Sequence, residues 1–315
     1  MADLRFDGRV AIVTGAGHGL GRCYALELAA RGAKVVVNDR ADLADTSGEA
    51  RIEPDVRTVT DTGGAAATAS ADVVAAEIRA RGGTALAAHA DISTEEGAGA
   101  LVEAALDTFD RVDVVVNNAG FLRDRAFANM TVAEWDAVLD VHLRGTFLVS
   151  RAAFGHLREH GYGRIVNTTS PTGLFGNFGQ SNYAAAKMGI VGLTKTLAIE
   201  GDRYDITANA VAPLAYTRMS SETLSAEDAA RLAPERVVPT VVWLAHEHCE
   251  TSGEIYAAGG GRVARVFVAE GPGADLGDAT VEDVRDRWPD INAERPYDIP
   301  RSRAEQTRDL LEGPP

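Results

Sequence analysis

A tyrosine and a lysine stand four residues apart in the segment Tyr183-Ala-Ala-Ala-Lys187. In a helix this spacing places both side chains on one face. A tyrosine could take up the proton that an alcohol loses on oxidation, but the pKa of a free phenol lies near 10. Lowering that pKa to about 7 takes roughly 4 kcal/mol of preferential stabilisation of the phenolate. The Lys187 ammonium and the positive charge of an oxidised nicotinamide could supply it together, so the pair predicts a proton-transfer site.

Ser170 precedes Tyr183 by 13 residues and follows a short apolar run that ends at Thr169. A hydroxyl in that position could donate a hydrogen bond to the substrate oxygen and orient it. We therefore predict that Ser170, Tyr183 and Lys187 are catalytic, and that they interconvert a secondary alcohol and a ketone.

Residues 14–21 read Thr-Gly-Ala-Gly-His-Gly-Leu-Gly, directly after an apolar run and before a helical pattern. Glycines in this setting allow a tight turn and let the backbone of a helix N-terminus approach phosphate groups. A glycine trio alone could be a plain flexible turn, so the position between strand and helix decides the interpretation. The predicted phosphate-binding residues are Gly15, Gly17, His18, Gly19, Leu20 and Gly21, with Gly19 and Gly21 expected to admit the pyrophosphate.

Asp39 follows Gly21 by 18 residues, at the end of the second apolar run. An acid at this point of a dinucleotide site accepts hydrogen bonds from the adenosine ribose hydroxyls. It would also repel the additional phosphate of NADP. Arg22 and Arg40 lie nearby in the sequence and could weaken this discrimination, and a solvated loop acid is the alternative interpretation. The sequence predicts NAD as the cofactor.

Small and polar residues follow two further apolar runs. In an open α/β sheet, ligands bind beyond the carboxyl ends of the strands. Each of these segments alone could be an ordinary turn, but together they favour a ligand crevice. The remaining predicted cofactor-binding residues are Asp91, Ile92, Asn118, Ala119 and Gly120, together with Tyr183 and Lys187.

The elements that must position these residues are strands and helices in alternation, the pattern of a parallel sheet. Continuous apolar strands suggest that helices cover both faces. The fold class is therefore α/β, a doubly wound parallel sheet of about seven strands. Capping boxes are predicted at Ser93 with Glu96 and at Thr131 with Glu134. The predicted strands span residues 9–14, 34–38, 85–90, 112–117, 164–169, 207–212 and 254–258.

Three segments lie outside this regular pattern. Residues 41–71 are too long for an ordinary connection and form an insertion that is either partly disordered or functional. Residues 213–236, with several apolar side chains, are expected either to cover the substrate or to pack on the core. Residues 262–315 form a charged C-terminal extension with an apolar piece at 263–268, which could dock on its own subunit or on a neighbour. We predict one domain over residues 1–261, followed by this extension.

Composition excludes several classes of function. The net charge of −15 argues against nucleic acid as a partner. Two cysteines in 315 residues form no disulfide framework, which fits a reducing compartment, and no metal site is predicted. Neither a signal peptide, a membrane span nor a C-terminal Ser-Lys-Leu address is recognisable, so we expect a cytoplasmic protein without a membrane partner.

The glycine motif, Asn117-Asn118-Ala119-Gly120, Ser170, Tyr183 and Lys187 resemble the short-chain dehydrogenase/reductase family in order and spacing. The match spans roughly residues 5–261. The resemblance implies a Rossmann-like domain, hydride transfer supported by the Ser-Tyr-Lys set, and binding of the nicotinamide ribose by Lys187. It also implies a homodimer or homotetramer.

A narrower resemblance rests on residues 4–10 (LRFDGRV), 141–145 (VHLRG) and 176–187 (GNFGQSNYAAAK). These segments are similar to the dehydrogenase units of peroxisomal multifunctional enzymes. Those units oxidise (3R)-3-hydroxyacyl-CoA with NAD, and relatives act on 17β-hydroxysteroids. The resemblance therefore implies an acyl-CoA or steroid-like small-molecule substrate, although substrate transfers between relatives less safely than mechanism.

His142 departs from the family, which usually has Asn at this position as the fourth member of a proton relay. Because the family's Asn acts largely through its main-chain carbonyl, His142 could preserve the relay and is included among the catalytic candidates. The alternative is a structural histidine. A protein that senses NAD without turnover is a further alternative, and the intact Ser170, Tyr183 and Lys187 weigh against it.

Overall fold

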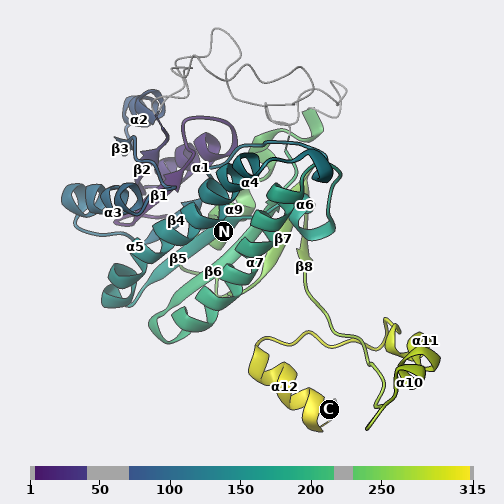
Figure 1. Ribbon diagram of the computed structural model, residues 1–315. Helices are drawn as coiled ribbons and strands as arrows, with labels where there is room; N and C mark the ends of the chain where they lie inside the picture. The colour runs from purple at the N-terminus through teal and green to yellow at the C-terminus, as the bar shows by residue number, and fades with distance from the viewer. Residues whose placement is uncertain (1–3, 41–70, 216–229, 313–315) are drawn as a thin grey trace. The chain divides into compact units, whose positions relative to one another are not determined.

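The computed structural model describes residues 4–40, 71–215 and 230–312 (Figure 1). The predicted insertion lies outside these residues except for Ala71, which begins a helix. Most of the segment expected to cover the substrate, residues 216–229, also lies outside them. Within the described ranges, no helix is both long enough and apolar enough to cross a membrane.

The core of the fold is one eight-stranded sheet in the order β3-β2-β1-β4-β5-β6-β7-β8. The pairs from β3 through to β7 are parallel. The strand order reverses between β1 and β4, which is the point where α/β sheets of this kind bind ligands. The strands are β1 (Val10–Thr14), β2 (Lys34–Asn38), β3 (Thr84–Ala88), β4 (Val114–Asn117), β5 (Gly163–Thr168), β6 (Ile206–Pro213), β7 (Ile255–Gly259) and β8 (Arg262–Val266).

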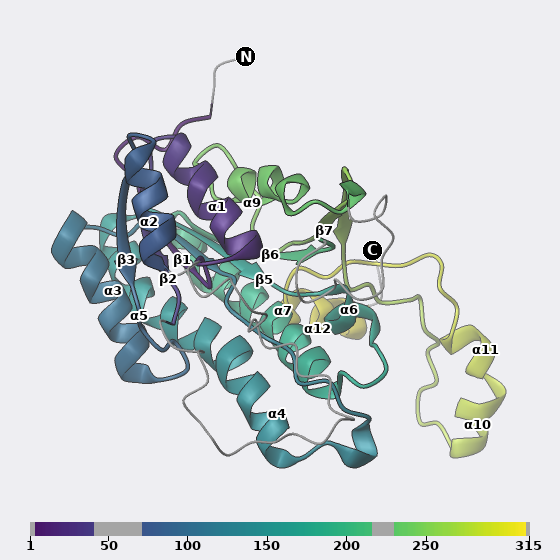
Figure 2. The same cartoon turned by 90° about the horizontal axis from the view of Figure 1, so that it is seen from above.

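Helices cover both faces of the sheet, as Figures 1 and 2 show. Alternate side chains of β1 enter two separate cores: Ala11 and Val13 join the core on one face, and Val10 and Ile12 join the core on the other. Full burial of both strand faces explains the continuous apolar runs of the sequence. One face is covered by α1 (Gly19–Ala30), α2 (Ala71–Ala80) and α9 (Val238–Leu244), and the other by α3 (Glu95–Phe109), α5 (Gly145–His160) and α7 (Ser181–Gly201).

The predicted fold class is confirmed, with one strand more than the expected seven. The additional strand, β8, follows β7 after only Gly260 and Gly261. A two-residue connection is too short for a parallel crossover, so β7 and β8 form a hairpin, and β8 is the edge strand of the sheet. It forms from part of the apolar piece that the sequence analysis assigned to the C-terminal extension.

Short helical segments connect the longer elements: η1 (Phe127–Asn129), α4 (Val132–Leu139), the π-helical segment η2 (Asp140–Arg144), α6 (Pro171–Phe175), η3 (Asp202–Tyr204) and η5 (Pro234–Arg236). Thr131 and Glu134 form the predicted reciprocal capping box at the start of α4. The capping box predicted at Ser93 and Glu96 is wrong by one residue, because the Ser93 hydroxyl donates to the Asp91 carboxylate and Thr94 caps α3 instead.

The chain divides into two compact units between Arg265 and Val266, four residues after the predicted boundary. The second unit contains α10 (Val281–Asp286), α11 (Trp288–Ile291) and α12 (Arg303–Glu312). In the described backbone of this unit, one antiparallel bridge, between Glu270 and Asp298, is the only hydrogen bonding between residues far apart in the sequence. None of the side chains described in residues 266–308 is buried. Over residues 266–308 the unit therefore has no hydrophobic core of its own to offset the entropy of ordering it.

Candidate active site

Tyr183, the predicted proton-transfer residue, lies in the first turn of α7, and a buried asparagine fixes that turn. Asn182 donates through Nδ2 to the carbonyls of Arg123 (3.0 Å) and Glu134 (3.1 Å). Its Oδ1 accepts from the backbone N–H of Tyr183 at 2.7 Å. Asn182 therefore joins the start of α7 to the loop that follows β4 and to α4. Asn182 was not predicted from the sequence. Its position directly before Tyr183 was the one feature that could have indicated a role in the site.

Ser170 reaches Tyr183 from the end of β5, as predicted from the sequence. It caps α6, and its Oγ accepts from the backbone N–H of Thr172 at 3.1 Å. The Ser170 side chain is also hydrogen-bonded to that of Tyr183. The cap fixes the position of the serine oxygen, so the two hydroxyls converge on one point where a substrate oxygen can bind.

Lys187 lies one helical turn beyond Tyr183, with only 2% of its surface exposed. Its Nζ donates to the carbonyl of Thr168 at 2.7 Å and lies 5.5 Å from the centroid of the Tyr183 ring. Burial lowers the pKa of Lys187 to about 7, because a low-dielectric environment disfavours the ammonium form. The ammonium form is therefore much less favoured here than in water.

The pKa of Tyr183 differs from what the spacing suggested. Burial is the largest influence and raises the pKa above 10, the hydrogen bond from Ser170 lowers it, and the charge of Asp124 raises it. Lys187 is not among the groups that shift this pKa, so the stabilisation of the phenolate expected jointly from Lys187 and a positive nicotinamide stays a prediction.

His142 packs edge-on against Tyr183, with ring centroids 5.1 Å apart. Its Nε2 lies 2.7 Å from the carbonyl oxygen of Phe121 and 3.0 Å from the amide nitrogen of the same residue. A single ring nitrogen can donate to the first or accept from the second, but not both. Within the described chain, its buried Nδ1 has no hydrogen-bond partner. A Cβ at Gly120 would collide with this ring, so only glycine fits there.

These contacts give the His142 side chain a structural part in the site. Burial, and then the charge of Lys187, hold the pKa of His142 well below 6.5, so the ring is neutral. The ring ties the π-helical segment η2 to the loop after β4. The main-chain carbonyl of His142 accepts from the Thr146 hydroxyl at 2.6 Å and retains a second lone pair. Its participation in a proton relay stays a prediction.

The predicted cofactor-binding segments meet at the point where the strand order reverses. Thr14, at the end of β1, accepts through Oγ1 from the amides of Asn118 (3.0 Å) and Ala119 (3.2 Å). The Asn118 side chain donates in return to the carbonyls of Thr14 and Gly15. The glycine turn and the segment after β4 are therefore held together, and Gly120 continues from this junction to His142 and the catalytic residues.

The glycine turn fits the phosphates of a dinucleotide, although Gly21 acts differently from the prediction. A Cβ at Gly21 would collide with the carbonyl of Gly15 and the side chain of Asn118, so this glycine serves helix packing rather than the approach of a pyrophosphate. The N-cap residue His18 makes no side-chain capping bond, and the first turn of α1 contains no acidic residue. Backbone amides at this helix N-terminus can thus bind phosphate oxygens.

Asp39 faces the glycine turn, as a residue that binds adenosine ribose should. Its Oδ2 accepts from the Gly17 amide at 2.9 Å and lies 3.2 Å from Nδ1 of His18. The neighbouring strand end carries Asp91, whose carboxylate accepts from the Ser93 amide and hydroxyl. Ile92 beside it is buried. The predicted residues after β2 and β3 thus lie along the same carboxyl edge of the sheet as the glycine turn.

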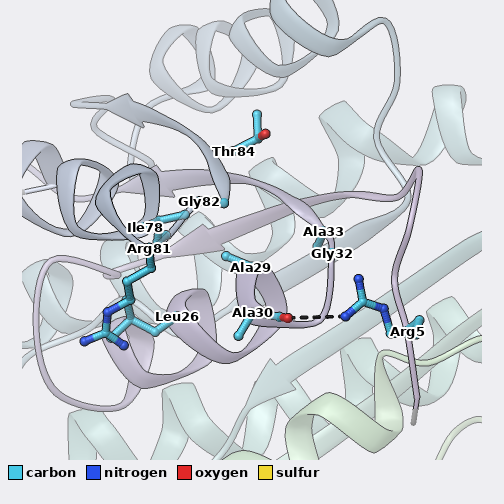
Figure 3. Close-up of a pocket in the computed structure, with 11 residues that line it drawn as sticks. Arg5, Leu26, Ala29, Ala30, Gly32, Ala33, Ile78, Arg81, Gly82 and Thr84 are labelled. Atoms are coloured by element: carbon cyan, nitrogen blue, oxygen red, sulfur yellow. Dashed lines mark hydrogen bonds between the residues drawn. The ribbon is translucent and has the colours of Figure 1, made fainter. Parts of the chain in front are cut away.

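A cavity of about 360 Å³ lies elsewhere on the domain (Figure 3). It is bordered by Arg5, the end of α1 and Thr84, the first residue of β3. Because β3 runs parallel to the other strands, its first residue belongs to the amino edge of the sheet. The cavity contains none of the predicted site residues and is not the catalytic crevice.

Comparisons with known proteins agree with this geometry. A family model described as short chain dehydrogenase matches residues 9–60 and 62–228. The chain is 49% identical over 284 residues to a putative short-chain type dehydrogenase/reductase of Mycobacterium tuberculosis, covering 90% of this chain and 93% of that protein. It is 41% identical over 274 residues to a hydroxyacyl-CoA dehydrogenase of the same organism, covering 82% of this chain and 80% of the relative.

A solved structure extends the comparison to the narrower resemblance. The full-length peroxisomal multifunctional enzyme type 2 of Drosophila melanogaster superposes with a TM-score of 0.80 at 36% identity, over 98% of this chain. The chain spans half the length of that enzyme. The protein belongs to the short-chain dehydrogenase/reductase family. It is an oxidoreductase acting on CH–OH donors, and its similarity to the multifunctional enzymes is confirmed.

The raised pKa of Tyr183 predicts how the rate depends on pH. The phenol must lose its proton before it can accept one from an alcohol, so kcat/KM for alcohol oxidation should rise with pH from about 7 to 10. Tyr183→Phe should lower that rate by about 100-fold or more. Buried Tyr162 offers a matched control, Tyr162→Phe, which should retain the wild-type profile. Full activity of Tyr183→Phe, or a profile that falls over this range, would contradict the assigned role.

The buried, neutral ring of His142 predicts how stability depends on pH. In the unfolded chain its pKa is about 6.5, so its contribution to stability is present above that pH and is lost as the pH falls. At pH 5, about 1.5 pH units below the unfolded pKa, the loss is at most about 2 kcal/mol. His142→Asn removes the titrating group. The free energy of unfolding, measured with urea at pH 5 and at pH 8, should therefore differ less between the two pH values in this variant than in the wild type. Exposed His160→Asn serves as the control. Equal pH dependence in wild type and His142→Asn would refute the prediction.

Proposed function

We propose that this protein is an NAD-dependent dehydrogenase that interconverts (3R)-3-hydroxyacyl-CoA and 3-oxoacyl-CoA thioesters. The observation that carries the proposal is the hydrogen-bonded Ser170 and Tyr183 pair with Lys187 buried one helical turn away. A bound nicotinamide supplies the acceptor for the hydride that leaves the carbinol carbon. The chain's own groups then handle the substrate oxygen and its proton.

Tyr183 is the general base in oxidation and the general acid in reduction. Its Oη takes the proton of the substrate hydroxyl as the carbon–oxygen bond becomes a carbonyl, and it returns that proton in the reverse direction. Ser170 donates a hydrogen bond to the same substrate oxygen, which fixes the angle at which the carbinol carbon is presented. Lys187 would bind the nicotinamide ribose hydroxyls, as the family resemblance implies, and its lowered pKa supports proton exchange near neutral pH.

The substrate class rests on the relatives and on the mechanism together. A relative with 41% identity over 82% of the chain carries the name hydroxyacyl-CoA dehydrogenase. The multifunctional enzyme that superposes on the chain is about twice its length, so only the dehydrogenase step is proposed here. The (3R) stereochemistry follows from the resemblance of residues 141–145 and 176–187 to the dehydrogenase units of such enzymes.

We also propose that the protein forms a homodimer or homotetramer. Phe147 on α5 and Met188 and Ile199 on α7 are apolar side chains with large exposed surfaces. Helices α5 and α7 cover the same face of the sheet, so these side chains lie on one side of the domain. Exposed apolar groups on adjacent helices support an interface between subunits. The cytoplasmic location stays a prediction from the sequence.

A turnover screen tests the proposed substrate. Purified enzyme with NAD should oxidise a (3R)-3-hydroxyacyl-CoA at least about tenfold faster, in kcat/KM, than its (3S) isomer or a 17β-hydroxysteroid, since a tenfold preference needs about 1.4 kcal/mol of transition-state discrimination. Faster turnover of the steroid would replace the proposed substrate class while leaving the catalytic residues in place.

Cofactor choice is tested by comparing kcat/KM with NAD and with NADP on the best substrate. We expect NAD to be preferred by at least about tenfold, because the Asp39 carboxylate repels the 2′-phosphate. Asp39→Ala should narrow that preference by removing the like charge. A wild-type preference for NADP would refute both the cofactor and the role given to Asp39.

A further inference from the structure

Two arginines near the glycine turn are both committed to carboxylates, and the sequence alone left their effect open. Arg22, on α1, places Nη2 at 2.9 and 2.7 Å from the two carboxylate oxygens of Glu77 on α2. Arg40, directly after Asp39, places Nη1 at 3.1 Å from the carboxylate of Asp91. The two cations that could receive the 2′-phosphate of NADP are therefore already neutralised.

Arg22 is the better placed of the two to bind a phosphate if it were released. Its amide donates to the carbonyl of His18 at 3.0 Å, so the two residues lie one above the other on α1. His18 in turn lies 3.2 Å from the Asp39 carboxylate, which faces the adenosine end of the predicted site. Arg22 is thus one helical turn from the residue that contacts this carboxylate, and its guanidinium has the forked donors that phosphate recognition uses.

The Arg22–Glu77 pair is also the more firmly held. Both oxygens of Glu77 bind the guanidinium, and the pair is partly buried, with 38% of the arginine and 23% of the glutamate side chain exposed. The Arg40–Asp91 pair has 48% and 37% exposed and a longer contact. Exposed ion pairs with single contacts are worth little, so Arg40 is less strictly held than Arg22.

We propose that Glu77 is a cofactor-specificity residue, which binds Arg22 and thereby withholds it from the 2′-phosphate of NADP. Asp39 repels that phosphate directly, and Glu77 removes the cation that would offset the repulsion. Glu77 is a positioning residue, since it acts through Arg22 and need not touch the cofactor. This inference rests on the proposed preference for NAD and names the second determinant of that preference.

The test measures cofactor binding without turnover, by titrating NADPH and NADH into the enzyme and following nucleotide fluorescence. Glu77→Gln keeps the size of the side chain and removes its charge. It should tighten NADPH binding by roughly fivefold, the most that a partly exposed charge pair usually contributes, while changing the Kd of NADH by less than about twofold. The control is Glu27→Gln, which breaks the pair between Glu27 on α1 and Arg31 at the C-cap of that helix. It should change neither the Kd of NADPH nor that of NADH.

A double-mutant cycle assigns the effect to Arg22. Glu77 also pairs with Arg81, the residue directly after α2, so the Glu77→Gln variant releases two arginines. Arg22→Gln should leave NADPH binding unchanged in the wild-type background and abolish the gain in the Glu77→Gln background. A gain that survives Arg22→Gln would overturn the assignment to this pair.

The outcomes separate this inference from the proposed function. Wild-type enzyme that binds NADPH more tightly than NADH would refute the proposed cofactor. Preference for NADH in the wild type, with no tightening of NADPH in Glu77→Gln, would refute only the role of Glu77. If Glu77→Gln melts below the assay temperature, Glu77→Asp replaces it. That shorter side chain should loosen the pair and also tighten NADPH, and unchanged binding would again overturn the inference.

Discussion

Burial of the Tyr183–Lys187 pair is the constraint on which the rest of the site depends. Removing both groups from water raises the pKa of the phenol and lowers that of the amine. In the protein alone, the favoured state has a neutral phenol beside an amine that is only partly charged. Such a pair responds strongly to any positive charge brought close to it, because little solvent is present to screen the interaction. The burial of Lys187 and the partial burial of Tyr183 therefore make the protonation of the pair sensitive to a nearby positive charge.

The sheet supplies the geometry that this constraint requires. Strand order reverses between β1 and β4, and the segments after these two strands are joined by the bonds between Thr14 and Asn118. From there Gly120 carries the chain against His142, whose ring touches Tyr183. Each step is a close contact between small or buried groups, which leaves little room for independent movement. A continuous series of contacts thus joins the glycine turn to the residues around Tyr183.

The sequence predicted β1, β2 and the position of Tyr183 and Lys187 on one helix well, because buried strands rich in valine and an i, i+4 pair on a helix carry strong local signals. It could not predict the direction of the Tyr183 pKa shift, since spacing shows proximity to Lys187 but not the depth of burial. The packing role of Gly21 depends on Asn118, almost a hundred residues later, and the cap of α3 depends on whether Ser93 is already bound to Asp91. These features arise from tertiary contacts that a local pattern does not contain.

Electrostatics around the glycine turn explain how an acidic chain can bind an anionic dinucleotide. The net charge of −15 opposes such a ligand, and the nearby Arg22 and Arg40 are occupied by carboxylates. Attraction to the phosphates must then come from the backbone amides at the start of α1, where His18 leaves them uncapped and no acid lies in the first turn. Amides act over a short range and only along the helix axis, whereas an arginine would attract phosphate from several directions. Binding by amides therefore accepts the pyrophosphate common to both dinucleotides and gives no advantage to an extra phosphate on the ribose.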